Sequence, residues 1–196
     1  NKTSYKNLSS IKGQISKIKK AVKIIKSSKK VVIIAGGGIK YTAQHQVVIK
    51  LAEYLNVPIV TAAGHGDAIP FNCKLNAGQM GPRGNPVASK LVKEADVIIA
   101  LGTRLGFNST FYSYDNINKK AKIIQIELEK KMLGRYFPVS VGIHADAATA
   151  TNQIYNEIKK QKITLNIKAW TEEFFNERIK FIFKRDIVSI KKKFPI

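Results

Sequence analysis

Three consecutive glycines, Gly36–Gly38, follow a short apolar run in this chain of 196 residues. The run, Val31–Ala35, is typical of a strand buried on both faces, and a helical pattern comes after the glycines. A glycine turn between a strand and a helix lets the backbone approach a phosphate, and the helix N-terminus beside it favours negative charge. A tight turn without any ligand is the simpler interpretation. The residues alone leave both interpretations open.

Two common nucleotide motifs do not match this turn. A dinucleotide fingerprint has the spacing G-x-G-x-x-G; Gly36 and Gly38 fit its first two positions, but Tyr41 stands at the third. The acidic residue expected at the end of the next strand is missing, because Thr61–Ala63 stand there. The phosphate-binding pattern G-x-x-x-x-G-K-[ST] is absent from the chain. The sequence therefore argues against a dinucleotide dehydrogenase and a nucleotide hydrolase of these kinds.

The remaining candidates for chemistry give weaker signals. The histidines, His45, His65 and His144, lack the spacing of metal ligands, so we expect solvated or hydrogen-bonded side chains and no metal site. The lone Cys73 excludes an internal disulfide and has no evident base nearby in the sequence. Asp146 begins a helical pattern, where it can serve as an N-cap or contact a ligand. No residue of the chain is predicted to be catalytic.

Apolar runs and helical patterns alternate along the chain. Strands are expected at 31–35, 57–61, 96–101, 122–127 and 139–143, and helices at 11–27, 42–55, 86–94, 146–160 and 170–193. This alternation predicts an α/β fold, a Rossmann-like doubly wound parallel sheet of about five to six strands with helices on both faces. Long irregular loops at 64–85 and 102–120 follow the carboxyl ends of strands. Doubly wound sheets bind ligands at those ends, so we expect a ligand cleft there.

The charge balance is strongly basic, with 34 Lys and Arg against 13 Asp and Glu and a net charge of +21. Only 5 of the basic residues are arginines, the type that nucleic-acid readers favour for bidentate contacts. The lysines crowd both ends of the chain, which solvated helix faces explain. We therefore expect only non-specific, salt-sensitive nucleic-acid binding. A free-standing basic nucleotide- or nucleic-acid-binding domain remains an alternative.

The expected location is cytoplasmic. No apolar run approaches the roughly 18 residues of a membrane span, and the basic N-terminus lacks the apolar core of a signal peptide. A single cysteine suits a reducing compartment. The absence of an initial Met and the terminal KKKFPI are hints that the chain is part of something longer.

A series of short motifs is more specific in its order than any motif alone. VVIIAGGG is followed by VPIVTAAGHGDAIP, AGQMGPRGN, EADVIIALGTRLG, AKIIQIELE and FPVSVGIHADA. Over about 11–160, the series resembles the central domain of thiamine diphosphate-dependent enzymes of the acetolactate synthase type. Within that family, KKMLGRYFPVSVGI looks most like the sulfoacetaldehyde acetyltransferases. The resemblance implies three regions: an N-terminal linker and helix at 1–29, the central domain at 30–162, and at 163–196 a linker helix toward a missing C-terminal catalytic domain.

The resemblance also implies the chemistry of the whole enzyme. Such enzymes activate thiamine diphosphate with a glutamate of their first domain and hold Mg²⁺ and the diphosphate with a Gly-Asp-Gly…Asn motif of their third. GDA at 66–68 lacks the asparagine about 25 residues on. The implied cofactors are thus thiamine diphosphate and Mg²⁺ in the full-length enzyme but not in this segment. The missing domains are the implied partners, in a homodimer or homotetramer.

The implied reaction converts sulfoacetaldehyde and phosphate to acetyl phosphate and sulfite. An acetolactate synthase-type or other 2-oxo acid reaction is the alternative. The central domain of such enzymes holds FAD, ADP or nothing. The resemblance carries candidate cofactor contacts over to these positions: Gly36, Gly37, Gly38, Gly78, Gly81, Arg104, Glu127 and Asp146.

Departures from the family pattern count against FAD. Acetolactate synthases have Arg-Phe-Asp-Asp-Arg where this chain has RLGFN, so only Arg104 is kept. Glu127 and Ala145 replace an aspartate and a glycine of the family. We expect a nucleotide-shaped cleft with a structural role, which takes ADP more readily than FAD if it is occupied. A bound nucleotide should meet the backbone amides of the glycines, and Arg104 should reach its phosphates or ring edge.

Overall fold

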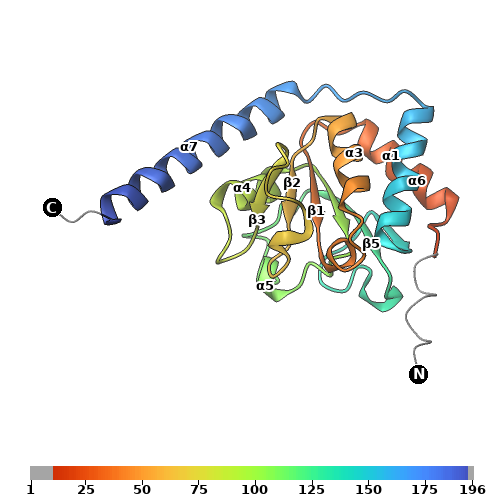
Figure 1. Ribbon diagram of the computed structural model, residues 1–196. Helices are drawn as coiled ribbons and strands as arrows, with labels where there is room; N and C mark the ends of the chain where they lie inside the picture. Colours follow the sequence, from red (N-terminus) through yellow and green to blue (C-terminus); the bar gives the residue numbers. More distant parts are fainter. Residues whose placement is uncertain (1–10, 194–196) are drawn as a thin grey trace.

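A single sheet forms the centre of the molecule. The computed structural model describes residues 11–193, with side chains to residue 181 (Figure 1), so positions 1–10 of the expected linker lie outside it. The strands are β1 (Val31–Ala35), β2 (Ile59–Thr61), β3 (Asn76–Gln79), β4 (Val97–Leu101), β5 (Lys122–Glu127) and β6 (Val141–His144), in the order β3-β2-β1-β4-β5-β6. Every pairing within this sheet is parallel. The predicted Rossmann-like sheet is therefore confirmed.

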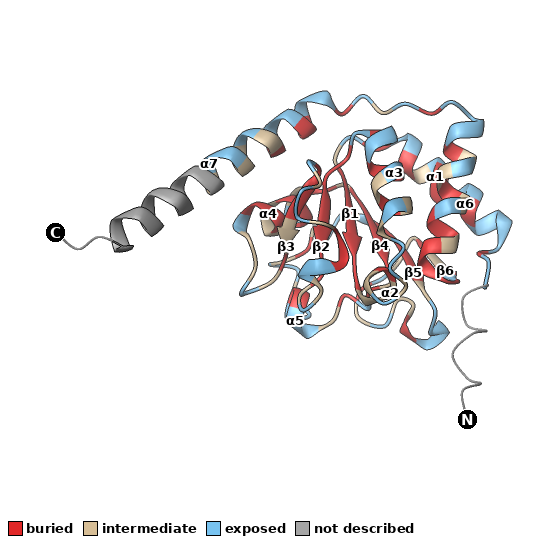
Figure 2. Ribbon diagram, viewed as in Figure 1, coloured by how far each residue is buried: buried red, intermediate tan, exposed pale blue. Residues whose placement is uncertain are grey.

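Helices cover both faces of the sheet (Figure 1). They are α1 (Ile15–Lys26), α2 (Gly37–Lys40), α3 (His45–Leu55), α4 (Pro86–Glu94), α5 (Phe107–Thr110), α6 (Ala147–Lys160) and α7 (Lys168–Lys193), with 3₁₀ turns at η1 (Gly66–Ala68) and η2 (Lys130–Met132). One layer holds α1, α3 and α6, in which α6 contacts both of the others, and α4 and α7 pack together on the other side. The strands between the layers are almost wholly buried (Figure 2). This burial explains their β-branched composition.

Strand β3 corrects the sequence analysis, which left 64–85 as an irregular loop. Its residues, NAGQ, carry no apolar run and give no strand pattern. They form a strand because they pair with β2 at the edge of the sheet, with a register shift between Ile59 and Thr61. Tertiary pairing therefore overrides the local preference of this segment.

The helix expected at 42–55 is also shorter than predicted. A separate short helix, α2, follows the glycines, and α3 begins only at His45. Ala43 lies between the two helices at a φ of +54°, a left-handed conformation that interrupts the helical path.

Helix α7 is anchored at its start. Trp170 is 5% exposed, and its Nε1 donates to the Val31 carbonyl at 2.9 Å. Thr171 donates to the Asn56 carbonyl at 2.6 Å, and Glu173 pairs with Lys90 of α4 at 3.0 Å. These contacts hold the first turns of α7 on the domain, away from the carboxyl ends of the strands. That end of the sheet stays open for a ligand.

Candidate functional site

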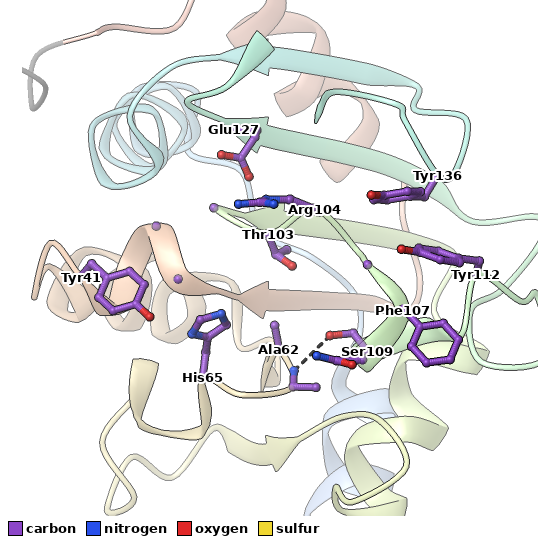
Figure 3. Close-up of a pocket in the computed structure, with 16 residues that line it drawn as sticks. Tyr41, Ala62, His65, Thr103, Arg104, Phe107, Ser109, Tyr112, Glu127 and Tyr136 are labelled. Carbon is purple, nitrogen blue, oxygen red and sulfur yellow. Dashed lines mark hydrogen bonds between the residues drawn. The ribbon is translucent and has the colours of Figure 1, made fainter. Parts of the chain in front are cut away.

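A cleft of about 570 Å³ opens at the carboxyl ends of β1, β2, β4 and β5 (Figure 3). The strand order reverses between β1 and β4, and doubly wound sheets bind ligands at such a point. The expectation of a cleft beside the two long loops is confirmed. Its lining comes from the turn after β1, the loops after β2 and β4, the end of β5 and the loop before β6: Gly37, Gly38, Tyr41, Ala62, Ala63, His65, Gly102, Thr103, Arg104, Gly106, Phe107, Asn108, Ser109, Tyr112, Glu127 and Tyr136.

The glycine turn packs tightly against the end of β4. The amide of Gly36 donates to the Leu101 carbonyl at 2.9 Å, and that of Gly38 donates to the Gly102 carbonyl at 3.0 Å. A Cβ on Gly36 would lie 2.5 Å from the Gly102 oxygen, and one on Gly38 would lie 2.7 Å from the Gly102 Cα. Glycine is needed here because two backbone segments touch. Both amides are used within the fold, so neither meets a ligand in the way the sequence analysis expected.

Gly37 differs from the glycines on either side of it. Gly37 lines the cleft, and its amide has no hydrogen-bond partner among the described residues. A Cβ there would meet only side chains, the His65 ring at 3.1 Å and the Tyr41 ring at 3.2 Å. Gly37 is therefore the glycine of this turn whose amide is left for a ligand.

The other positions carried over from the family divide into two groups. Arg104 and Glu127 line the cleft with Gly37 and Gly38. Gly36, Gly78, Gly81 and Asp146 do not line it.

The residues away from the cleft have structural contacts. Gly78 donates to Asn76 Oδ1 at 2.9 Å, and a Cβ on Gly81 would lie 2.6 Å from the Asn108 oxygen. Asp146 is 5% exposed and accepts the Thr149 amide at 2.7 Å, so it is the N-cap of α6. These contacts give the three residues roles in packing and capping.

The cleft lining includes one basic and one acidic side chain, Arg104 and Glu127. The Arg104 guanidinium lies between the glycine turn and the tyrosines and makes no hydrogen bond or ion pair with a described residue (Figure 3). Nearby, the ion pair with Lys131, and the more distant charges of Arg104 and Arg135, hold the pKa of Glu129 below its usual value. A guanidinium without a carboxylate partner suits an anionic group such as a phosphate.

Sequence reasoning missed several lining residues. Tyr112 and Tyr136 stack with ring centroids 4.5 Å apart, although they belong to different loops. His65 was expected to be an ordinary loop histidine, but it lines the cleft, stands edge-on to Tyr41 at 5.9 Å, and buries Nδ1 without a partner among the described residues. The aromatic side chains in GFNSTFY and GRYF were the available signal for the two tyrosines.

The GDA segment at 66–68 is bonded within the fold and does not lie in a cluster of acidic side chains among the described residues. Within residues 11–181, no group of three or more His, Cys, Asp or Glu side chains is placed to hold a metal ion. Asp67 of the GDA segment lies in the 3₁₀ turn η1, and its carboxylate pairs with Lys40 at 2.9 Å.

Among the described helices, none combines the length and apolar character needed to cross a membrane.

The fold and the cleft together define a class, a doubly wound α/β domain with a ligand cleft at its topological switch point. The family described as "Thiamine pyrophosphate enzyme, central domain" matches residues 18–154. The chain belongs to this family, as the resemblance implied.

The curated relatives of this chain include sulfoacetaldehyde acetyltransferases and acetolactate synthases. A sulfoacetaldehyde acetyltransferase of Alcaligenes xylosoxydans xylosoxydans is 38% identical over 144 residues, which cover 72% of this chain and 24% of the relative. The sulfoacetaldehyde acetyltransferase of Castellaniella defragrans is 36% identical over 145 residues, which cover 73% of this chain and 24% of the relative. A probable acetolactate synthase large subunit of Methanococcus aeolicus is 30% identical over 168 residues, covering 82% and 28%. The chain thus spans about a quarter of the length of these relatives.

Proposed function

We propose that this chain is the central domain of a thiamine diphosphate-dependent acetyltransferase that acts on sulfoacetaldehyde. The supporting observation is the identity of 34–38% to sulfoacetaldehyde acetyltransferases. In the proposed reaction, the carbon–sulfur bond of sulfoacetaldehyde breaks and sulfite leaves. The two-carbon unit then passes to inorganic phosphate as acetyl phosphate.

The proposed enzyme is larger than this chain. Domains corresponding to the rest of the relatives would hold thiamine diphosphate and Mg²⁺, and the whole would be a cytoplasmic homodimer or homotetramer. Carbanion stabilisation is the chemistry that thiamine diphosphate supplies when bound. In this proposal, residues 163–196 link the domain to the next one, and the present chain contributes structure and a ligand cleft.

An acetolactate synthase-type reaction on a 2-oxo acid is the second candidate. Its support is the Methanococcus aeolicus relative, which matches a larger share of this chain, 82%, at a lower identity of 30%. The two candidates differ in substrate and product, so one assay separates them.

The assay uses the full-length enzyme that carries this domain, loaded with thiamine diphosphate and Mg²⁺. We expect sulfoacetaldehyde and phosphate to yield sulfite and acetyl phosphate in equal amounts. Pyruvate alone should yield no acetolactate. Acetolactate from pyruvate, with no sulfite from sulfoacetaldehyde, would replace the first candidate with the second.

For the cleft, the proposed ligand is ADP. The Gly37 amide and the Arg104 guanidinium have no partner among the described residues and are donors that suit phosphate oxygens, and a cleft of about 570 Å³ has room for a nucleotide. The loop Arg104–Asn108 lacks the acidic pair of the acetolactate synthase pattern, so FAD should bind less tightly than ADP.

Calorimetric titration of the 196-residue chain tests the ligand. A lost charge-assisted hydrogen bond costs about 1.5–3 kcal/mol, so Arg104→Ala should weaken ADP binding roughly ten- to hundred-fold with little change in thermal stability. Arg83→Ala is the matched control, because Arg83 is exposed but does not line the cleft. Tighter binding of FAD than of ADP, or equal effects of the two substitutions, would contradict this assignment.

A further inference from the structure

Tyr112 and Tyr136 form one wall of the cleft. Their rings stack at a centroid distance of 4.5 Å and an interplanar angle of 29°. Both hydroxyl groups point in the same direction, into the cleft (Figure 3). Tyr112 follows β4, whereas Tyr136 lies between β5 and β6. The stack therefore exists only if two separate loops are held at a fixed spacing.

Gln125 of β5 ties these two loops together. Its side chain is 2% exposed; Nε2 donates to the Thr103 carbonyl at 3.1 Å, and Oε1 accepts the Gly134 amide at 2.8 Å. Thr103 begins the first loop, and Gly134 stands two residues before Tyr136 in the second. Moving either loop would leave a polar group of this buried amide unpaired, which is costly. The amide thus fixes the distance between the loops.

A chain of hydrogen bonds continues from Thr103 to Tyr112. The Leu105 amide donates to Thr103 Oγ1 at 3.3 Å, the Thr110 hydroxyl donates to the Leu105 carbonyl at 3.0 Å, and the Tyr112 amide donates to Thr110 Oγ1 at 3.1 Å. Thr110 is fully buried at 0% exposure. Tyr112 has a φ of +56°, a backbone conformation that residues other than glycine rarely adopt unless the surrounding structure enforces it. Its position therefore depends on contacts that begin at Gln125.

We infer that Gln125 is a positioning residue: without touching a ligand, it sets the spacing of the Tyr112–Tyr136 pair, whose hydroxyls contact the oxygen-rich part of a nucleotide in the cleft. This inference rests on the proposed function of the cleft. The neighbouring Tyr136 side chain is the main cause that raises the pKa of Tyr112 above its ordinary value, with a smaller effect of desolvation. Together with Arg104, the pair supplies donors for phosphate or ribose oxygens.

The test compares Gln125→Met with a matched control, Gln153→Met. Gln153 also bridges two backbone groups, because its Oε1 accepts the Gly13 amide at 2.7 Å and its Nε2 donates to the Gly13 carbonyl at 3.1 Å. It lies on α6 and does not line the cleft. Two measurements are made on each variant of the 196-residue chain: titration with ADP, and spectrophotometric titration of the tyrosines at alkaline pH.

We expect Gln125→Met to weaken ADP binding about tenfold, the loss of roughly one good hydrogen bond, and to lower the titration midpoint of one tyrosine. Gln153→Met should change neither. Equal ADP affinity of the two variants, with unchanged tyrosine titration, overturns the inference. If the wild type does not bind ADP, the proposed ligand is wrong, and the tyrosine titration alone decides whether Gln125 positions the pair.

A second variant applies if Gln125→Met does not fold. Tyr136→Phe removes one hydroxyl, keeps the ring and leaves the buried network intact. We expect it to lower the titration midpoint of Tyr112 and to weaken ADP binding about fivefold. No change in either measurement contradicts the assignment of the pair to the ligand.

Discussion

The glycine turn at 36–38 and the loop at 103–112 meet at the same cleft, but their backbones differ. The turn is held by hydrogen bonds and close packing, whereas the loop contains residues in strained conformations. The amides of Gly36 and Gly38 donate hydrogen bonds to the carbonyls of Leu101 and Gly102, and the close packing leaves no room for a side chain on either glycine. The loop instead holds Leu105, Phe111 and Tyr112 at positive φ. Strain of this kind persists where the surroundings enforce it, and it concentrates at binding sites.

Exposure separates the two regions as well. Phe107 is 53% exposed and Tyr112 is 49% exposed, although aromatic side chains bury much apolar area when they can. Gly36 is buried, and Gly38, although it lines the cleft, has backbone atoms where a side chain would lie. The difference teaches that the glycines, which drew attention in the sequence, build the floor of the cleft, whereas the loop after β4 supplies many of its lining side chains.

The largest expected effect is on the turn. Gly36→Ala places a Cβ 2.5 Å from the Gly102 oxygen and 2.6 Å from the Thr103 Cβ, so the backbone must shift. We expect the free energy of unfolding to fall by about 3 kcal/mol, as in other overpacked sites. Urea denaturation measures this change.

Gly106→Ala is the control for that measurement. Gly106 lies in the loop at a φ of −77°, and a Cβ there meets nothing within 4 Å. The free energy of unfolding of the Gly106→Ala variant should differ from that of the wild type by no more than about 0.5 kcal/mol. Similar losses for the two alanine variants would remove the contrast between a packed turn and an open loop.

A smaller loss of stability is expected when the Thr110 hydroxyl, which supports the loop at 103–112, is removed. Thr110→Val keeps the shape of the side chain but removes the acceptor of the Tyr112 amide and the donor to the Leu105 carbonyl. Leaving buried polar groups unpaired should lower the free energy of unfolding by about 2 kcal/mol. Thermal and urea unfolding measure the loss. Wild-type stability in this variant would mean that the loop holds its strained conformation without Thr110.

Gly37→Ala separates binding from stability within the turn. Its Cβ would meet the His65 ring at 3.1 Å and the Tyr41 ring at 3.2 Å, and both side chains can move. The cost in unfolding free energy should stay below about 1 kcal/mol, while ADP affinity falls because the methyl group crowds the free amide. Calorimetry and urea denaturation on the same sample check both. A stability loss as large as that of Gly36→Ala would make the whole turn structural.

The smallest effect concerns the ion pair between Lys40 of α2 and Asp67 of η1. The hydrogen-bonded pair with Lys40 lowers the pKa of Asp67 from its ordinary 3.8, and the pair with Asp67 raises the pKa of Lys40 from 10.5. The folded pKa of Asp67 lies below the unfolded one, so its stabilisation is complete above the unfolded value and is lost as pH falls through the folded value. The contribution of Lys40 is lost at the alkaline end, as pH rises through its folded pKa.

Asp67→Asn should therefore melt slightly below the wild type near neutral pH, and the difference should vanish as pH falls through the folded pKa of Asp67 and shrink in high salt. Melting curves across pH measure this, with Asp115→Asn as a control, since Asp115 is exposed and has no ion pair among the described residues. A difference that persists in acid, or that Asp115→Asn reproduces, would argue against an effect of the ion pair.

Much of the fold followed from local pattern. The strands at Val31–Ala35 and Lys122–Glu127 and the helix at Pro86–Glu94 have the predicted bounds, because β-branched runs and an Asn-Pro helix start act locally. Strand β3 escaped prediction because pairing with β2, not its own residues, makes it a strand. Interactions between distant segments cannot be inferred from local periodicity.

The site was predictable in location but not in its contacts. Arg104 and Gly37 were placed in the cleft by the family pattern, and they lie there. The same pattern also named Asp146, whose carboxylate caps α6 instead. Tyr136 was missed because its stacking on Tyr112 depends on a buried amide of a third element, β5.

The most direct test of the central claim is a map of backbone amide chemical shifts in the 196-residue chain during titration with ADP. We expect the largest changes at Gly37, Arg104, Tyr112 and Tyr136, since these residues line one cleft at the switch point of the sheet. Changes centred on the lysines of α1, or the absence of any change at millimolar ADP, would contradict a nucleotide cleft built by the loops after β4 and β5.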